Sequence, residues 1–510
     1  MSHVHATVEH GELRGVRIAG ADRFLGIPYG ADTSGENRFR APQPVEAWEG
    51  VRDALVFGPS APQPDLRLSA PALLGPVLSL LMPRGASPVE SGAISEDCLR
   101  VNVWTPSDRD GRSLPVLVWF HGGGFGFGSG NEMSFNGDLL ATAADMVVVT
   151  VTHRLGLLGF LDLRAQGEAG SANAGMLDIV AALEWVQRNI AAFGGDPARV
   201  TVCGQSGGSG KVAALTAMPK ARELFSRAIM MSGPFGKPAR PESSAAVAER
   251  ALADAGVDTV ADLRRLPLER LLAVQAGLRT QGFFPNRDEK PDFAAVTGFG
   301  PCLDPVDLPG DAFGDEASEG LRGKELLVGW TSHEATFLLS AEPDFTADLT
   351  AARAAERVDA LAHIDGVTYA DLAARHPHEA PHLLLGRRMS WLTFIGPSRD
   401  VADLASAKAA GVWAYEFQQP TEVLDGLLGA CHSLELAYVF GTVGRIPLTG
   451  RGLQRHAVSR DMMRAWARFV HDGDPGWRHW GAERVVQAFG SPIGEGAELP
   501  EDVDMAAPLR

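Results

Sequence analysis

The sequence predicts an α/β protein with a mostly parallel central sheet, flanking helices and large helical insertions. Short apolar runs, many of them β-branched, alternate with segments of helical periodicity in the first half of the chain. Val116–Phe120 and Met146–Thr152 are two such runs, and apolar residues recur at nearly helical spacing from Leu177 to Phe193. Runs that are apolar on both faces are typical of strands buried in a parallel sheet.

Three later apolar runs extend the predicted sheet: Val200–Cys203, Glu325–Trp330 and Val412–Phe417. Ala-, Leu- and Arg-rich stretches predict helical, cap-like insertions within 241–300 and 340–400. The 510 residues could hold about three domains of ~150 residues, yet the chain has no repeat, low-complexity tract or obvious linker. We therefore expect one catalytic domain over residues 1–510.

The charge and the cysteine pattern argue against several classes of protein. Lys and Arg number 46 against 63 Asp and Glu, so no basic surplus is present to neutralise a nucleic acid. No apolar run reaches the roughly 18 residues of a membrane helix, and the N-terminus lacks an export-signal pattern. The four cysteines show no metal-binding spacing. The sequence thus predicts a cytoplasmic protein with no membrane span, metal, cofactor or nucleic-acid partner.

A nucleophile motif follows the strand predicted at Val200–Cys203. Gly204–Gly208 reads GQSGG, which matches G-x-S-x-G, and a helical stretch of small residues comes after it. In this strand–turn–helix context the tight turn exposes the Ser206 hydroxyl, and small residues are needed where the chain crosses itself. Taken alone, the motif is equally compatible with an ordinary Gly/Ser turn.

A second glycine motif strengthens this interpretation. His121–Phe125 reads HGGGF and follows the strand Val116–Phe120, as the oxyanion motif of esterases does. Acyl transfer needs fixed backbone N–H groups that point at the developing oxyanion. The predicted donors are Gly123, Gly124 and Gly207.

A serine nucleophile needs a histidine base and an orienting carboxylate further along the chain. His432 follows the strand at Val412–Phe417 and a glycine-bearing loop, although a helix-capping loop histidine would look the same. Glu334 lies just beyond the strand at Glu325–Trp330, although the first turn of any helix favours a glutamate. Asp304, Asp307 and Asp311, in a proline-rich loop, are less favoured rivals.

Several further segments make the chain resemble the type-B carboxylesterase/lipase family, the carboxylesterase/cholinesterase-like branch of the α/β-hydrolase superfamily. The segments are Phe24–Tyr29 (FLGIPY), Glu96–Pro106 (EDCLRVNVWTP), Leu155–Phe160, Asn189–Pro197 and Leu224–Gly233. The resemblance implies the α/β-hydrolase fold and a catalytic triad of Ser206, Glu334 and His432. It also implies an oxyanion hole formed by Gly123, Gly124 and Gly207, and a structural salt bridge between Glu96 and Arg154.

The chain departs from the family pattern at several positions. Gln205 and Gly207 replace the usual Glu and Ala beside the nucleophile, as in bacterial para-nitrobenzyl-esterase-like or aryl-carbamate-hydrolase-like members. Thr331 replaces the usual Asn near Glu334, and His153 stands in place of a Tyr near the site. Ala61 replaces the cysteine that pairs with Cys98 in extracellular members, which favours a reduced protein.

These features predict a serine carboxylesterase that hydrolyses small-molecule esters through an acyl-enzyme, as a monomer or homodimer. A carbamate or amide hydrolase, a transacylase and, more remotely, a non-catalytic binding protein are the alternatives. Candidate walls of the substrate pocket are aromatic, and each is equally compatible with a place in the core. They are Phe127, Phe283, Phe284, Trp391 and Phe394.

Overall fold

The computed structural model describes residues 2–83, 93–109, 111–233, 238–278, 298–311, 314 and 319–491. A single sheet of 12 strands runs through this part of the chain. The strands are β1 (Ser2–Val8), β2 (Gly11–Ile18), β3 (Ala21–Pro28), β4 (Val51–Asp53), β5 (Arg100–Pro106), β6 (Leu114–Phe120), β7 (Val147–Thr152), β8 (Gly195–Gln205), β9 (Arg227–Met231), β10 (Glu325–Thr331), β11 (Gly411–Phe417) and β12 (Val486–Phe489).

The sheet confirms the predicted fold class, because most of its central strands are parallel. The spatial order is β1-β2-β3-β5-β7-β6-β8-β9-β10-β11-β12, and β4 pairs with β2. Pairing is parallel from β7 and β6 through to β12, and antiparallel from β1 to β7 at the other end. The carboxyl ends of β6, β8, β10 and β11 therefore meet at one edge, where ligands of open α/β sheets bind.

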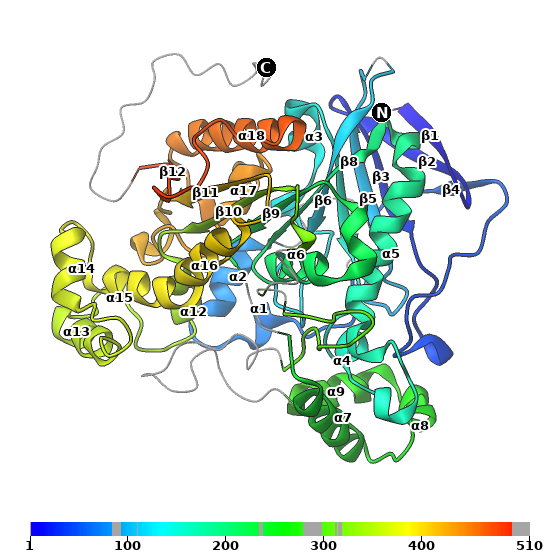
Figure 1. The fold of residues 1–510 in the computed structure, drawn as a ribbon, viewed down its shortest axis with the longest axis horizontal. Helices are drawn as coiled ribbons and strands as arrows, with labels where there is room; N and C mark the ends of the chain where they lie inside the picture. Colours follow the sequence, from blue (N-terminus) through cyan, green and yellow to red (C-terminus); the bar gives the residue numbers. More distant parts are fainter. Residues whose placement is uncertain are drawn as a thin grey trace.

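Two helical layers bury the two faces of the sheet. Along β6, Val116 and Val118 belong to one apolar core, whereas Leu117 and Trp119 belong to the other. Figure 1 shows α3 and α18 together along one side of the sheet. The helices that contact the first face are α5 (Ala174–Asn189), α6 (Gly207–Ala217) and α16 (Gly396–Ala405), and those on the second are α3 (Asp138–Ala144) and α18 (Gln454–Asp472).

The predicted insertion regions contain helices that lie at the periphery of the molecule (Figure 1). The first group is α7 (Pro241–Ala255), α8 (Val260–Arg265) and α9 (Leu268–Leu278), and the second is α13 (Ala351–Ala360), α14 (Tyr369–Arg375) and α15 (Pro381–Ser390). The second group forms a small apolar core of its own with α12 (Glu334–Leu339). No helix among the described residues is long and apolar enough to cross a membrane.

The predicted salt bridge between Glu96 and Arg154 is wrong. Glu96 accepts two hydrogen bonds from the Arg38 guanidinium, at 2.5 and 2.8 Å. Arg154, just past β7, forms a two-point ion pair with Asp178 on α5, at 2.6 and 2.8 Å. Both pairs are almost fully buried. Each charge is thus neutralised by a partner whose identity the sequence pattern did not reveal.

Candidate active site

Ser206 lies at the turn between β8 and α6, at the carboxyl edge of the sheet. Its backbone has φ 58° and ψ −124°, a conformation that side-chain-bearing residues rarely adopt. The turn is held because Ser206 N–H donates to Met231 O of the neighbouring strand β9 (2.9 Å), and Gly210 N–H donates to Ser206 O (3.1 Å). This geometry places Ser206 ahead of the amino end of α6, as a nucleophile elbow requires.

The elbow depends on glycines because three backbone segments cross at very short range. A Cβ atom on Gly204 would lie 2.3 Å from the carbonyl carbon of Gly208, and one on Gly208 would lie 2.1 Å from Phe120 O. Both neighbours are backbone atoms that cannot move aside as a flexible side chain would. The G-x-S-x-G pattern therefore has a steric cause in this fold.

The structure brings Glu334 and His432 into direct contact. Glu334 Oε2 lies 2.5 Å from His432 Nδ1, and Glu334 Oε1 accepts the Thr331 N–H at 2.7 Å. Glu334 is fully buried and His432 is 3% exposed. A carboxylate at Nδ1 orients the ring so that Nε2 is the nitrogen that can accept a proton.

The loops that carry these two residues are tied together by backbone contacts. His333 and Cys431 form a parallel β-bridge, in which His333 N–H donates to Ala430 O at 2.9 Å. The ring of Phe394 contacts the His432 ring with a centroid distance of 4.8 Å, and the Phe337 ring lies at 5.7 Å. The imidazole is thus fixed by one carboxylate and two aromatic rings.

The carbonyls in the glycine motif are held so that their peptide planes are fixed. His121 Nδ1 lies 2.8 Å from Gly122 O, and Gly123 O accepts the N–H groups of Gly126 (3.3 Å) and Phe127 (3.2 Å). In a trans peptide the N–H points away from the preceding C=O. The Gly123 and Gly124 N–H groups therefore have fixed directions, as an oxyanion hole needs.

Gly207 lies against the same loop. A Cβ atom at this position would lie 2.2 Å from Gly124 O and 2.4 Å from Gly124 Cα. The usual alanine of the family pattern would not fit beside this backbone. The loop that carries the predicted oxyanion donors is therefore closer to the nucleophile turn than an alanine allows.

Ser206 and His432 line the same cavity, which has a volume of about 60 Å³. This volume is smaller than the about 300–1,000 Å³ of most ligand pockets. The other lining residues come from α2 (Leu74–Leu81), the segment from Gly122 to Phe135, the end of β8, α12 and the segment around His432. They are Leu78, Leu81, Met82, Gly122, Gly123, Phe127, Gly128, Glu132, Ser134, Phe135, Gln205, Phe337, Leu338, Ser433 and Leu436.

The aromatic residues predicted as pocket walls have different positions. Phe127 lines the cavity, whereas Phe394 is fully buried against His432. Trp391 is 42% exposed and its ring contacts Arg399, so it does not line this cavity. Phe283 and Phe284 lie outside the described residues. Sequence reasoning missed Phe337, because an apolar position in a short helix after Glu334 carries no signal of its role.

Two polar residues near His432 were also missed as site residues. Gln205 Nε2 lies 3.2 Å from His432 Nε2, at the end of β8. Glu435 is fully buried and accepts a hydrogen bond from Ser232 Oγ at 3.1 Å. Burial and the nearby Glu334 charge raise the pKa of Glu435 well above its usual range. Glu435 thus holds its proton and adds no second negative charge beside Glu334.

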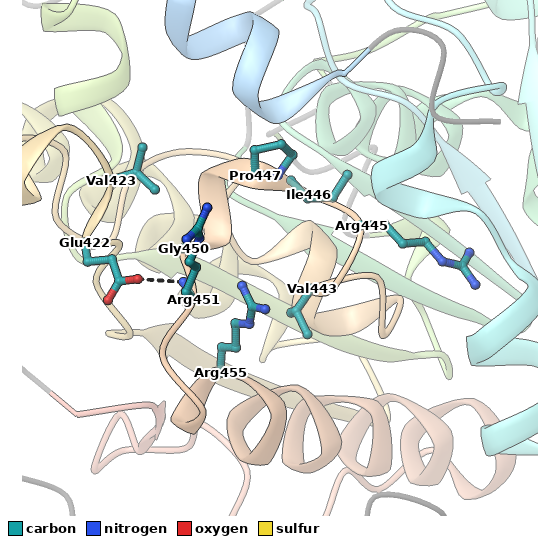
Figure 2. Close-up of a pocket in the computed structure, with 10 residues that line it drawn as sticks. Glu422, Val423, Val443, Arg445, Ile446, Pro447, Gly450, Arg451 and Arg455 are labelled. Atoms are coloured by element: carbon teal, nitrogen blue, oxygen red, sulfur yellow. Dashed lines mark hydrogen bonds between the residues drawn. The ribbon is translucent and has the colours of Figure 1, made fainter.

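A second cavity, of about 490 Å³, shares no lining residue with the Ser206 cavity. Figure 2 shows Arg451, Arg455 and Glu422 around it, with the Arg451 N–H donating to Glu422 Oε1 at 2.6 Å. Arg445, which also lines it, is paired with Asp138 at 2.8 and 2.9 Å. Its described lining includes no serine, cysteine or histidine, so it is not a candidate for nucleophilic catalysis.

Among the described residues, no group of three His, Cys, Asp or Glu side chains is placed to hold a metal ion. The strand order and the serine elbow at the carboxyl edge define an α/β-hydrolase. A model of the carboxylesterase family matches residues 2–483, so the chain belongs to this family and is a carboxylic ester hydrolase.

Similar proteins cover nearly the whole chain. Para-nitrobenzyl esterase of Bacillus subtilis is 35% identical over 487 residues, covering 93% of this chain and 91% of that protein. Phenmedipham hydrolase of Pseudarthrobacter oxydans is 34% identical over 509 residues, covering 97% of this chain and 96% of that protein. A solved para-nitrobenzyl esterase structure has a TM-score of 0.78 at 33% identity, with 96% of each chain covered.

Proposed function

We propose that Ser206, His432 and Glu334 are the nucleophile, base and acid of this esterase. One observation carries the assignment. His432, whose Nδ1 contacts Glu334, lines the same cavity as Ser206. Catalysis of this type needs a base that is oriented by a carboxylate and lies at the same site as the nucleophile. Gly123, Gly124 and Gly207 are proposed as oxyanion donors.

The proposed reaction has two steps. His432 takes the Ser206 proton while Oγ attacks the ester carbonyl, and backbone N–H groups stabilise the negative oxygen. As the tetrahedral intermediate collapses, its C–O bond to the alcohol breaks and His432 gives the proton to the departing oxygen, which leaves an acyl-enzyme on Ser206. Water then attacks the acyl group with His432 as base, which releases the carboxylic acid and restores Ser206.

Ser206→Ala tests the assignment with a p-nitrophenyl ester. We expect kcat to fall by about 10⁴-fold or more, since triad members act as a unit. Thermal unfolding of the variant provides the control for folding. A variant that retained wild-type turnover would show that Ser206 is not the nucleophile.

Carbamate hydrolysis is the second candidate activity. The Gln205–Gly208 sequence resembles aryl-carbamate-hydrolase-like members, and phenmedipham hydrolase is among the similar proteins. Phenmedipham and a p-nitrophenyl ester should be compared as substrates of the wild type and of Ser206→Ala. Ser206-dependent release of product from phenmedipham supports the second activity, whereas activity on the ester alone restricts the function to ester hydrolysis.

We also infer that the protein acts in the bacterial cytoplasm on small-molecule esters, as a monomer or homodimer. Cys98, Cys203, Cys302 and Cys431 are all buried free thiols, which a reducing compartment preserves. Cell fractionation tests the location, and light scattering of the purified protein tests the oligomeric state. Recovery from the periplasm, or a larger assembly, would contradict this inference.

A further inference from the structure

A buried lysine lies directly behind the oxyanion loop. Lys211 is on α6, five positions after Ser206, and is fully buried. Its Nζ donates to His121 O at 2.8 Å and to Gly124 O at 3.0 Å. The same atom lies 5.4 Å from the centroid of the Phe125 ring. One side chain therefore holds the first and last carbonyls of the His121–Gly124 stretch.

These contacts complete the set of restraints on the loop. The carbonyls of Gly122 and Gly123 are already held by the His121 ring and by the Gly126 and Phe127 amides. Lys211 holds the two flanking carbonyls, so all four C=O groups from His121 to Gly124 accept hydrogen bonds. The two middle carbonyls set the directions of the Gly123 and Gly124 N–H groups, and Lys211 anchors both ends of the stretch that carries them.

Among the described residues, the ionisable side chains around Lys211 are histidines rather than carboxylates. The ionisable side chains facing it are His121, after β6, and His153, after β7, whose rings stack at 5.0 Å and 15°. Burial and the Lys211 charge lower the pKa of both histidines well below the usual range, so both are neutral. Beyond His153, the Arg154 charge is neutralised by Asp178.

Burial alone lowers the pKa of Lys211 to about 7. A buried ammonium without a counter-ion is unfavourable, and a nearby negative charge relieves this cost. The tetrahedral intermediate on Ser206 places an oxyanion against the other side of the same loop. The lysine charge is therefore better stabilised in the transition state than in the free enzyme, which is what lowers a reaction barrier.

We propose that Lys211 is a positioning residue for the oxyanion hole: its ammonium holds both ends of the His121–Gly124 loop and adds a positive field behind the donors. The proposal rests on the proposed function of Ser206. It follows from two hydrogen bonds and the burial of a single side chain.

Two variants separate the charge of Lys211 from its hydrogen bonds. Lys211→Met removes both, whereas Lys211→Gln keeps a neutral N–H donor. Lys324→Met is the matched control. Lys324 also lies over a phenylalanine ring (Phe225, 5.3 Å). It comes just before β10, however, and so lies at the edge of the sheet opposite the site. Thermal unfolding of each variant checks that it is folded.

The first measurement is kcat and KM for a p-nitrophenyl ester as a function of pH. Wild-type kcat/KM should decline on the alkaline side as Lys211 loses its proton, from about pH 7 upward. Lys211→Met and Lys211→Gln should lose this decline and lower kcat by about 10- to 100-fold, with KM within about twofold. Lys324→Met should match the wild type in both respects.

The second measurement is the affinity for a trifluoromethyl ketone, which Ser206 converts to a hemiketal oxyanion as its proton passes to His432. Both Lys211 variants should bind this inhibitor at least about tenfold more weakly, because only the adduct carries the oxyanion. An unchanged inhibitor affinity, or a wild type with no alkaline decline, would overturn the proposal. The absence of an alkaline decline is measured on the wild type alone, so this result would overturn the proposal even if neither variant folds. Activity retained in Ser206→Ala would instead refute the proposed nucleophile.

Discussion

Glu334 and Glu435 are two buried carboxyl groups near His432 in opposite electrostatic settings. Glu334 contacts His432 Nδ1 and accepts the Thr331 N–H. Glu435 contacts Ser232, and burial raises its pKa well above the usual range. One carboxyl group is therefore placed to stabilise an imidazolium, and the other is neutral.

Because of this difference, we expect replacement of Glu by Gln to lower kcat by unequal amounts at the two positions. Glu334→Gln removes the charge beside His432, and we expect kcat to fall by about 10³- to 10⁴-fold. Glu435→Gln replaces a neutral acid by a neutral amide of the same shape, so kcat should change by less than about tenfold. Steady-state kinetics on a p-nitrophenyl ester compares the two variants. Equal losses would contradict the assignment of Glu334 as the acid.

Glu132, which lines the Ser206 cavity, predicts a pH-dependent effect on stability. Burial raises the pKa of Glu132 from 4.5 to about 7. The folded state then binds this proton more tightly than the unfolded state, so the free energy of unfolding falls as pH rises from 4.5 through 7.

Glu132→Gln cannot ionise and should escape this loss. At about pH 8 the variant should be more stable than the wild type by about 1–3 kcal/mol, at about 1.36 kcal/mol per pKa unit. At about pH 5 the two proteins should differ little. Urea unfolding at both pH values measures the difference, and an equal difference at both would contradict the raised pKa.

At the scale of elements, the site depends on how closely β6, β8 and α6 approach at the carboxyl edge of the sheet. Gly208, at the start of α6, touches the last residue of β6, and Gly207 touches the oxyanion loop. A change in one element is therefore transmitted to the others through backbone contacts.

Gly208→Ala tests this close approach. The added Cβ would lie 2.1 Å from Phe120 O, so we expect a loss of at least about 2 kcal/mol in stability and a lower kcat. Gly277→Ala on α9 is the control, because a Cβ there meets nothing within 4 Å. That substitution should stabilise the helix by about 0.5–1 kcal/mol. Similar effects at both positions, measured by thermal unfolding, would contradict the steric account.

The sequence predicted β6, β7, β8, β10 and β11, which lie in the parallel part of the sheet. It missed β9 and the strands of the antiparallel end, including β5, which is buried along its whole length. β6 is apolar throughout and β7 consists of valine and threonine, and both were predicted within one or two residues. β1 and β2 alternate polar and apolar residues in the N-terminal segment and were not predicted. β1 pairs with β2 and β2 pairs with β3 through short hairpins. These strands join the rest of the sheet where β3 pairs with β5, which is a long-range contact that local sequence does not reveal.

Residues of the site also divide into those that local sequence reveals and those that depend on contacts between distant parts of the chain. Ser206, Glu334, His432 and the glycines carry motif or strand-end signals and could be proposed from sequence. Lys211, Gln205 and Phe337 could not, because each matters through a contact with a residue far along the chain. Trp391 was proposed as a pocket wall by resemblance to the family and by its place near the motifs, but neither shows which way its side chain faces, and it is largely exposed.

At the scale of the whole molecule, one sheet joins the two ends of the chain. β1 and β2 form one end, and β10, β11 and β12 form the other. The core on the α5 and α6 face contains residues from Ala6 to Trp480. A shared core of this kind is the property of one folding domain rather than three.

We therefore predict that residues 1–510 unfold as one cooperative unit. Scanning calorimetry should show one transition whose calorimetric and van't Hoff enthalpies agree, because the two halves bury the same core. A covalent phosphonate on Ser206 should shift this transition without splitting it. Two resolved transitions would indicate separate domains.

Chemical trapping of the nucleophile tests the central claim most directly. The protein should be treated with a fluorophosphonate, and the adduct mapped by mass spectrometry of its peptides. We expect one phosphonyl group per chain, on Ser206, formed together with loss of esterase activity and absent from Ser206→Ala. Inactivation with the label on another residue, or equal labelling of Ser206→Ala, would contradict the account.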